Sequence, residues 1–211
     1  MPQINDPKTT WNENDFRACC HHLGYDPLKL VFSDGETLED VNPEVKRIIT
    51  QSYDCEVEHS EPLMSTDVLT GVINVYIPNV YAGDERASLA HEIFHVCFEK
   101  AREAYVEQSL AGSGPLLERF KDSFGTPTNL LFDVPNAVTT DYSCVYMMNF
   151  KKRYEDHTVT GDDFSLLVME ILSEIAATLE TSGTMPKSKV FCKFYRDIEQ
   201  TAIELGVIKR A

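Results

Sequence analysis

The sequence ERASLAHEIFHVCFEKAREAY, residues 85–105, predicts a long helix in the middle of this chain. Asp84 precedes it and is a suitable N-cap residue. The segment Gly112-Ser-Gly-Pro115 contains residues that break helices. We therefore expect a helix that runs from Glu85 to about Gln108.

Within this helix the segment His91-Glu92-Ile93-Phe94-His95 has the pattern HExxH. Residues four apart lie one turn apart on the same face, so His91 and His95 can direct ring nitrogens at one ion about 2.0–2.1 Å away. Glu92 can reach a water bound to that ion, whose pKa the metal lowers, and accept its proton. Because the pattern fixes only three residues, the alternative is an ordinary solvated helix turn.

The residues around the motif favour metal binding over a solvated turn. These neighbours are apolar or small: Leu89, Ala90, Ile93, Phe94, Val96 and Cys97. Histidines and a glutamate among such neighbours are buried and need polar partners, which a metal supplies. The motif therefore predicts His91 and His95 as metal ligands and Glu92 as the general base.

A catalytic zinc usually has three protein ligands, so a third is expected elsewhere in the chain. The best candidate lies in FSLLVMEILSEIAATLE, residues 164–180, an almost entirely apolar helix that carries Glu170 and Glu174 four residues apart. Burying two carboxylates without a counter-charge costs several kcal/mol, and a dication offsets this cost. We predict Glu170 as the ligand and Glu174 as the acceptor that orients a ligand histidine. The alternative is that both form the solvent face of the helix.

The rest of the sequence predicts one α+β domain over residues 1–211, without internal repeats. Further helices are expected at 13–23, 43–53, 116–124, 163–181 and 187–205, strands at 54–59 and 71–78, and a loop at 126–137. The C-terminal half is therefore mostly helical.

Composition and charge restrict the classes of partner. The chain has a net charge of −15, from 34 acidic and 19 basic residues, so it repels phosphate backbones and anionic lipids. We expect neither nucleic acid nor a membrane as a partner.

The scattered cysteines indicate reduced thiols, and the N-terminal residues lack a secretory signal. A cytoplasmic location is expected, with export by a leaderless route, as an effector or toxin, as the alternative.

Three local patterns resemble known zinc peptidases. HEIFH followed by EILSE on a later helix resembles the gluzincin metallopeptidases. The order MEILSEIAATLE then MPKSKVFCKFYRDIEQ is similar to lethal-factor-like toxin catalytic domains, and ERASLAHEIFH is similar to the ImmA/IrrE-type peptidases. These similarities cover about residues 71–200, the catalytic core they imply, whereas residues 1–70 match nothing. They imply a zincin-like fold, in which a small mixed sheet places the edge strand 71–78 on the HExxH helix.

The same resemblance implies zinc at His91, His95 and Glu170, with Glu92 as general base. The sequence departs from the family pattern at Phe94, where glycine is common, and in the long gap between His95 and Glu170. That gap leaves Asp141 and His157 as alternative third ligands. The tyrosine that stabilises the oxyanion in lethal-factor-like enzymes has no counterpart at its usual position. Its role is left open among four residues: Tyr142, Tyr146, Tyr154 and His157.

The sequence therefore predicts a zinc-dependent endopeptidase that binds an extended peptide antiparallel to strand 71–78. The net charge suggests that the cleaved segment is basic. Two alternatives come from other functional classes. The first is a catalytically silent zincin-like protein that acts by binding or regulation. The second is a purely structural zinc held by four protein ligands, with His157 as the fourth.

Overall fold

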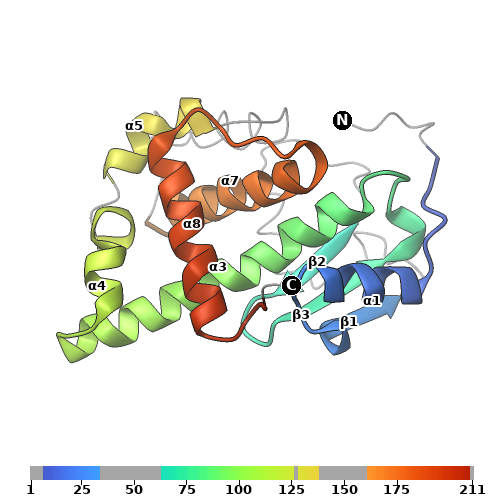
Figure 1. Cartoon of the computed structure of the whole chain (residues 1–211), viewed down its shortest axis with the longest axis horizontal. Helices are drawn as coiled ribbons and strands as arrows, with labels where there is room; N and C mark the ends of the chain where they lie inside the picture. The colour runs from blue at the N-terminus through green and yellow to red at the C-terminus, as the bar shows by residue number, and fades with distance from the viewer. Residues whose placement is uncertain (1–6, 34–62, 126–127, 138–160, 210–211) are drawn as a thin grey trace.

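The computed structural model describes residues 7–33, 63–125, 128–137 and 161–209. Over these ranges the protein is a mixed α+β structure, mostly helical, with a small three-stranded sheet (Figure 1). The helix expected at 43–53 and the strand expected at 54–59 lie outside the described residues. In the described part of the chain, no helix combines the length and the apolar character needed to cross a membrane.

The sheet places the predicted strand 71–78 at its centre. The strands are β1 (Leu30–Ser33), β2 (Met64–Asp67) and β3 (Val72–Tyr76). Their order is β1-β3-β2, with β1 parallel and β2 antiparallel to β3. The prediction of an edge strand at 71–78 is therefore wrong, because hydrogen-bonded strands flank β3 on both sides. Ile73 and Val75, both fully buried, point into the core, which explains the β-branched character that identified this strand.

Helix α3 (Glu85–Ala111) is the long element on which the other layers pack. It ends at Gly112, whose φ of 68° is the left-handed conformation common after a helix. Two later helices, α7 (Gly161–Ser182) and α8 (Lys189–Glu204), pack against it, and the sheet lies beside its N-terminal half (Figure 1). These three helices confirm those expected from the sequence, with ends shifted by up to three residues.

The start of α3 is fixed by hydrogen bonds from the segment before it and from the N-terminal part of the chain. Asp84 occupies the N-cap position, but its side chain makes no capping hydrogen bond. Instead the buried carboxylate of Glu85 accepts hydrogen bonds from the Gly83 amide at 2.7 Å and the Thr9 hydroxyl at 2.5 Å. These contacts fix the first turn of α3, which precedes the HExxH motif.

The smaller helices confirm two predictions and correct a third. Helix α1 (Glu13–His22) matches the expected first helix, and α4 (Pro115–Arg119) with the π-helical turn η3 (Lys121–Gly125) covers the short helix expected near residue 120. The loop expected at 126–137 is wrong, because α5 (Thr128–Ala137) is helical. Leu130, Val134 and Ala137 are buried at helical spacing, and this apolar stripe outweighs the proline and asparagines that suggested a loop.

Aromatic side chains fill the core between α3, α8 and the connection that follows α4. Phe194 of α8, 1% exposed, lies at the centre of this group. Its ring centroid is 6.1 Å from that of Phe98, 6.0 Å from Phe120 and 5.1 Å from Phe124. Such tilted and edge-to-face pairs are the preferred aromatic geometry, and they fix α8 against the C-terminal half of α3.

Candidate metal centre

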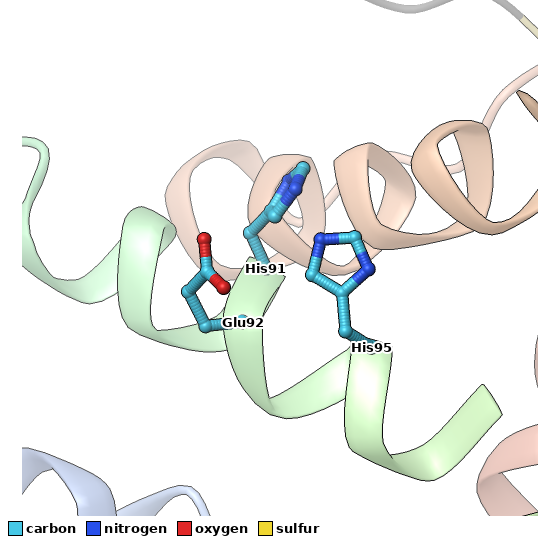
Figure 2. A group of neighbouring side chains, drawn as sticks. All are labelled: His91, Glu92 and His95. Atoms are coloured by element: carbon cyan, nitrogen blue, oxygen red, sulfur yellow. The ribbon is translucent and has the colours of Figure 1, made fainter. Parts of the chain in front are cut away.

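One turn of α3 brings His91, Glu92 and His95 together. Their potential ligand atoms lie within 4.8 Å of one another, and the two imidazole centroids are 4.6 Å apart. Figure 2 shows the three side chains on the same side of the helix. In the part of the chain that the structure describes, these residues form a candidate metal-binding triad. The spacing within HExxH produces this arrangement directly, because residues four apart share a helix face.

Helix α7 supplies two carboxylates to His91. The Nε2 atom of His91 lies 3.3 Å from Oε2 of Glu170, and its Nδ1 atom lies 3.0 Å from Oε1 of Glu174. Because Glu170 and Glu174 are one helical turn apart, they reach the two nitrogens of a single ring. The sequence placed both glutamates on one stripe of a helix, and the structure brings that stripe against the HExxH motif.

His95 faces the same helix in the same way. Its Nε2 atom is 3.7 Å from Oε1 of Glu170, and its Nδ1 atom is 3.4 Å from Oγ of Ser173. Both imidazoles therefore direct Nδ1 at a polar side chain of α7 and Nε2 at the Glu170 carboxylate. Histidines that bind metals usually have one nitrogen held in this way, which leaves the other free to coordinate.

The separation of these atoms tests whether a metal would fit between them. Two ligand atoms about 2.0–2.1 Å from a tetrahedral ion lie roughly 3.3 Å apart. The distance from His91 Nε2 to Glu170 Oε2 is 3.3 Å, and that from His95 Nε2 to Glu170 Oε1 is 3.7 Å. The two oxygens of Glu170 face different rings. Two imidazole nitrogens and a carboxylate form a donor set that suits zinc.

Burial and charge around the site perturb its pKa values. Burial disfavours a charged His91, but the hydrogen bonds to Glu170 and Glu174 outweigh it and raise the pKa of His91 well above its usual range. Burial lowers the pKa of His95, and the Glu170 carboxylate opposes this only in part. Burial acts to raise the pKa of Glu170, yet the neighbouring His95 and His91 rings lower it overall. The Glu170 carboxylate thus stays ionised in a buried place through its contacts with the two imidazoles.

The carboxylate of Glu92 is held by the sheet. The Thr66 hydroxyl on β2 donates a hydrogen bond to Glu92 Oε2 at 2.6 Å, and it also lies 3.3 Å from the Glu92 carbonyl oxygen. Sequence reasoning missed Thr66, because β2 is short and polar and carries no recognisable motif. It also gave no role to Ser173, although this serine lies between Glu170 and Glu174 in a helix whose other residues from 166 to 177 are apolar or small.

The packing of Phe94 explains why a large residue stands where the zinc peptidases that the sequence resembles commonly have glycine. Its ring is 4% exposed and stacks on Tyr195 of α8, with centroids 4.7 Å apart and planes 7° apart. The side chain thus fills the contact between α3 and α8. A large residue at this position therefore contributes to the packing of these two helices.

The other residues considered from the sequence lie outside the described residues. This applies to the alternative third ligands, Asp141 and His157. It applies equally to the candidates for stabilising an oxyanion: Tyr142, Tyr146, Tyr154 and His157.

Comparisons with protein-family models, with curated proteins and with solved structures find no match for this chain. The zincin resemblance therefore rests on the local motifs. The structure itself establishes a mixed α+β fold and the candidate triad His91, Glu92 and His95.

Proposed function

We propose that the protein is a zinc-dependent endopeptidase of the gluzincin type, with zinc held by His91, His95 and Glu170. The observation that carries this proposal is the convergence of the two Nε2 atoms on the Glu170 carboxylate, with both Nδ1 atoms held by α7. A zincin-like arrangement is part of the proposal. It is supported by the antiparallel strand β2 beside the motif and by the glutamate-bearing helix that packs on it.

The catalytic role falls to Glu92. When bound at these residues, zinc supplies a Lewis acid that lowers the pKa of water and polarises a peptide carbonyl. The Glu92 carboxylate lies within 4.8 Å of the ligand nitrogens, close enough to take a proton from water at the site. The water oxygen then bonds to the carbonyl carbon, and as the C–N bond breaks the same carboxyl group delivers that proton to the leaving amine nitrogen. Glu174 keeps Nδ1 of His91 hydrogen-bonded throughout, so the ring stays oriented.

The proposed substrate is a peptide or protein. Its docking on strand 71–78 is excluded, because β3 already pairs with β1 and β2. The net charge of −15 supports a basic segment around the cleaved bond. Equal cleavage of acidic and basic peptides from one library would contradict this preference.

A second candidate is a binding or regulatory protein that uses the same fold without a metal. The observation in its favour is that both ring nitrogens of His91 already have a carboxylate partner, since Nε2 lies 3.3 Å from Glu170 and Nδ1 lies 3.0 Å from Glu174. In that case the buried carboxylates need no dication.

A purely structural zinc differs from a catalytic one in having a fourth protein ligand and no coordination position open to water. The absorption spectrum of the cobalt-substituted protein shows whether such an open position exists.

The proposal is tested by combining metal loading with cleavage. The purified chain, loaded with zinc, is incubated with a peptide library prepared from a digested proteome, and new termini are identified by mass spectrometry. We expect cleavage that stops when a chelator removes the zinc and returns when zinc is restored. Zinc binding without cleavage would favour a structural site, and no zinc binding would favour the metal-free binding protein.

Replacing Glu174 with glutamine should weaken zinc binding by about 10–100-fold. The amide still reaches Nδ1 of His91, but it lacks the negative charge that makes the ring a better ligand. Competition with a chelating dye measures the affinity. Glu180→Gln is the matched control, because Glu180 lies on the same helix and pairs with Arg86 away from the histidines. Equal affinities of the two variants would contradict the role of Glu174.

A further inference from the structure

We propose that Thr66 is a positioning residue that holds the carboxylate of Glu92 in place for proton transfer. This inference rests on the proposed peptidase function and adds a residue from the sheet to a site otherwise built from two helices. It starts from a single contact, the hydrogen bond of 2.6 Å from Thr66 Oγ1 to Glu92 Oε2.

The hydroxyl of Thr66 has one proton and two nearby acceptors on Glu92. The carboxylate oxygen at 2.6 Å is much closer than the carbonyl oxygen at 3.3 Å, so the proton goes to the carboxylate. A bond to one oxygen of a carboxylate leaves the lone pairs of the other oxygen available for water. Figure 2 shows this carboxylate next to His91, on the side of α3 that carries both imidazoles.

Thr66 can perform this role only if β2 is fixed relative to α3. On the sheet side, Thr66 pairs with Ile73, a fully buried residue of the central strand. On the helix side, Lys100 of α3 donates a hydrogen bond to the carbonyl of Leu69 at 3.2 Å, in the turn that follows β2. The strand is thus tied to the same helix that carries Glu92.

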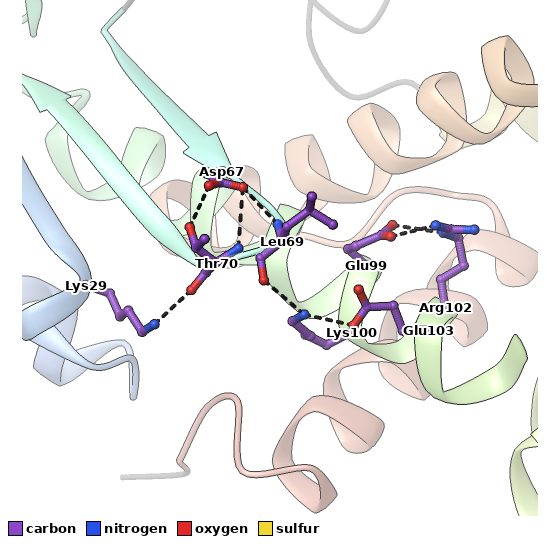
Figure 3. A network of polar contacts seen from close by, with 8 residues as sticks. All are labelled: Lys29, Asp67, Leu69, Thr70, Glu99, Lys100, Arg102 and Glu103. Atoms are coloured by element: carbon purple, nitrogen blue, oxygen red, sulfur yellow. Dashed lines mark hydrogen bonds and ion pairs between the residues drawn. The ribbon is translucent and has the colours of Figure 1, made fainter. Parts of the chain in front are cut away.

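The turn between β2 and β3 is itself held by side chains, as Figure 3 shows. Asp67 accepts hydrogen bonds from the Leu69 amide at 3.0 Å and from the Thr70 hydroxyl at 2.7 Å. Lys29 donates to the Thr70 carbonyl at 2.8 Å. Thr66 immediately precedes this network, so its hydroxyl is presented to Glu92 from a strand whose end is anchored by two lysines.

Glu92 needs such a partner because its side chain is long and partly exposed. A glutamate in this setting samples several rotamers, and each productive proton transfer requires one of them. A hydrogen bond from a fixed strand selects that rotamer before substrate arrives. Loss of an outer contact of this kind typically costs about 10–100-fold in activity.

Thr66→Val tests the role, because valine keeps the branched shape and suits a strand but removes the donor. With the best-cleaved library peptide as substrate, we expect kcat to fall about 10–100-fold while KM and zinc content stay near those of the wild type. Thr66→Ser restores the hydroxyl and should recover most of the lost kcat. Ser65→Ala is the matched control, since the Ser65 hydroxyl contacts Asn74 and Tyr76. A change in KM alone, or an unchanged kcat, overturns the proposal.

A second measurement detects the hydrogen bond itself without substrate or metal, and its result is then combined with the zinc binding and activity of the wild type. Thr66→Val, Glu92→Ala and the double variant form a cycle of thermal unfolding experiments, in which a hydrogen bond makes the Tm shifts non-additive by about 2–4 °C. If the Tm shifts of the two single variants add up to that of the double variant while the wild type cleaves peptides, the role of Thr66 is overturned and the peptidase function stands. If the Tm shifts are non-additive but the zinc-loaded wild type cleaves no library peptide, the hydrogen bond exists and the peptidase function is contradicted. The role of Thr66 in proton transfer is then contradicted with it.

Discussion

Replacing Glu92 with glutamine should lower the rate of peptide cleavage by about 10²–10⁴-fold, the usual contribution of a general base. Glutamine has nearly the same size and still accepts a hydrogen bond from Thr66, but it cannot take a proton from water. Zinc content should stay at the wild-type level, because Glu92 is not among the three proposed ligands. The measurement is the initial rate of cleavage of one library peptide by the zinc-loaded variant.

The control for this substitution is Glu107→Gln, which removes the same charge from an exposed position near the end of α3. It should cleave at the wild-type rate. If Glu92→Gln retained activity within about threefold of this control, a general base at Glu92 would be ruled out, since its expected contribution is far larger. Cleavage by another residue, or by a contaminating protease, would then be the explanation.

Replacing Phe194 with alanine should reduce the free energy of unfolding by about 3–5 kcal/mol. The ring is 1% exposed and contacts three other phenylalanines, so its removal leaves a cavity that the rigid aromatic neighbours cannot close. Urea denaturation measures the change. Such a loss is a large fraction of the stability of an ordinary domain.

The neighbouring residue Lys193 provides the control for Phe194→Ala. Its side chain is 67% exposed and pairs with Asp197 on the surface of α8. Lys193→Ala should change the stability by less than about 1 kcal/mol, because exposed ion pairs contribute little. If the two variants lost similar amounts, the aromatic group would not be the core that joins α8 to α3.

Helices were easier to predict from this sequence than strands. The ends of α3 and α7 follow from long apolar stripes and from breakers such as Gly112 and Gly183, which are local features. The position of β3 within the sheet depends on β1 and β2, and both are only four residues long. Such short strands carry too few residues for an alternating pattern. The edge position of strand 71–78 is implied only by the resemblance to zinc peptidases, and the sequence of β1 and β2 offers no pattern that would oppose it.

The candidate site likewise has contacts that the sequence predicts and one that it does not. The approach of Glu170 and Glu174 to His91 could be anticipated, because a buried carboxylate pair requires a partner and the sequence offers a histidine pair. The contact between Thr66 and Glu92 could not, because it joins residues 26 positions apart and depends on the register of β2. The cost of burying charged side chains thus predicts which charged residues lie close together. The register of the strands determines which uncharged residues, such as Thr66, contact them.

The most direct test of the metal centre is the zinc content of the purified chain, measured by elemental analysis beside the His91→Ala and Glu170→Ala variants. We expect about one zinc per wild-type chain and its loss from both variants, as a site with three protein ligands requires. Zinc retained by Glu170→Ala but lost from His91→Ala would contradict Glu170 as the third ligand. A wild-type chain that binds no zinc, even when zinc is supplied in excess, would contradict the metal centre itself.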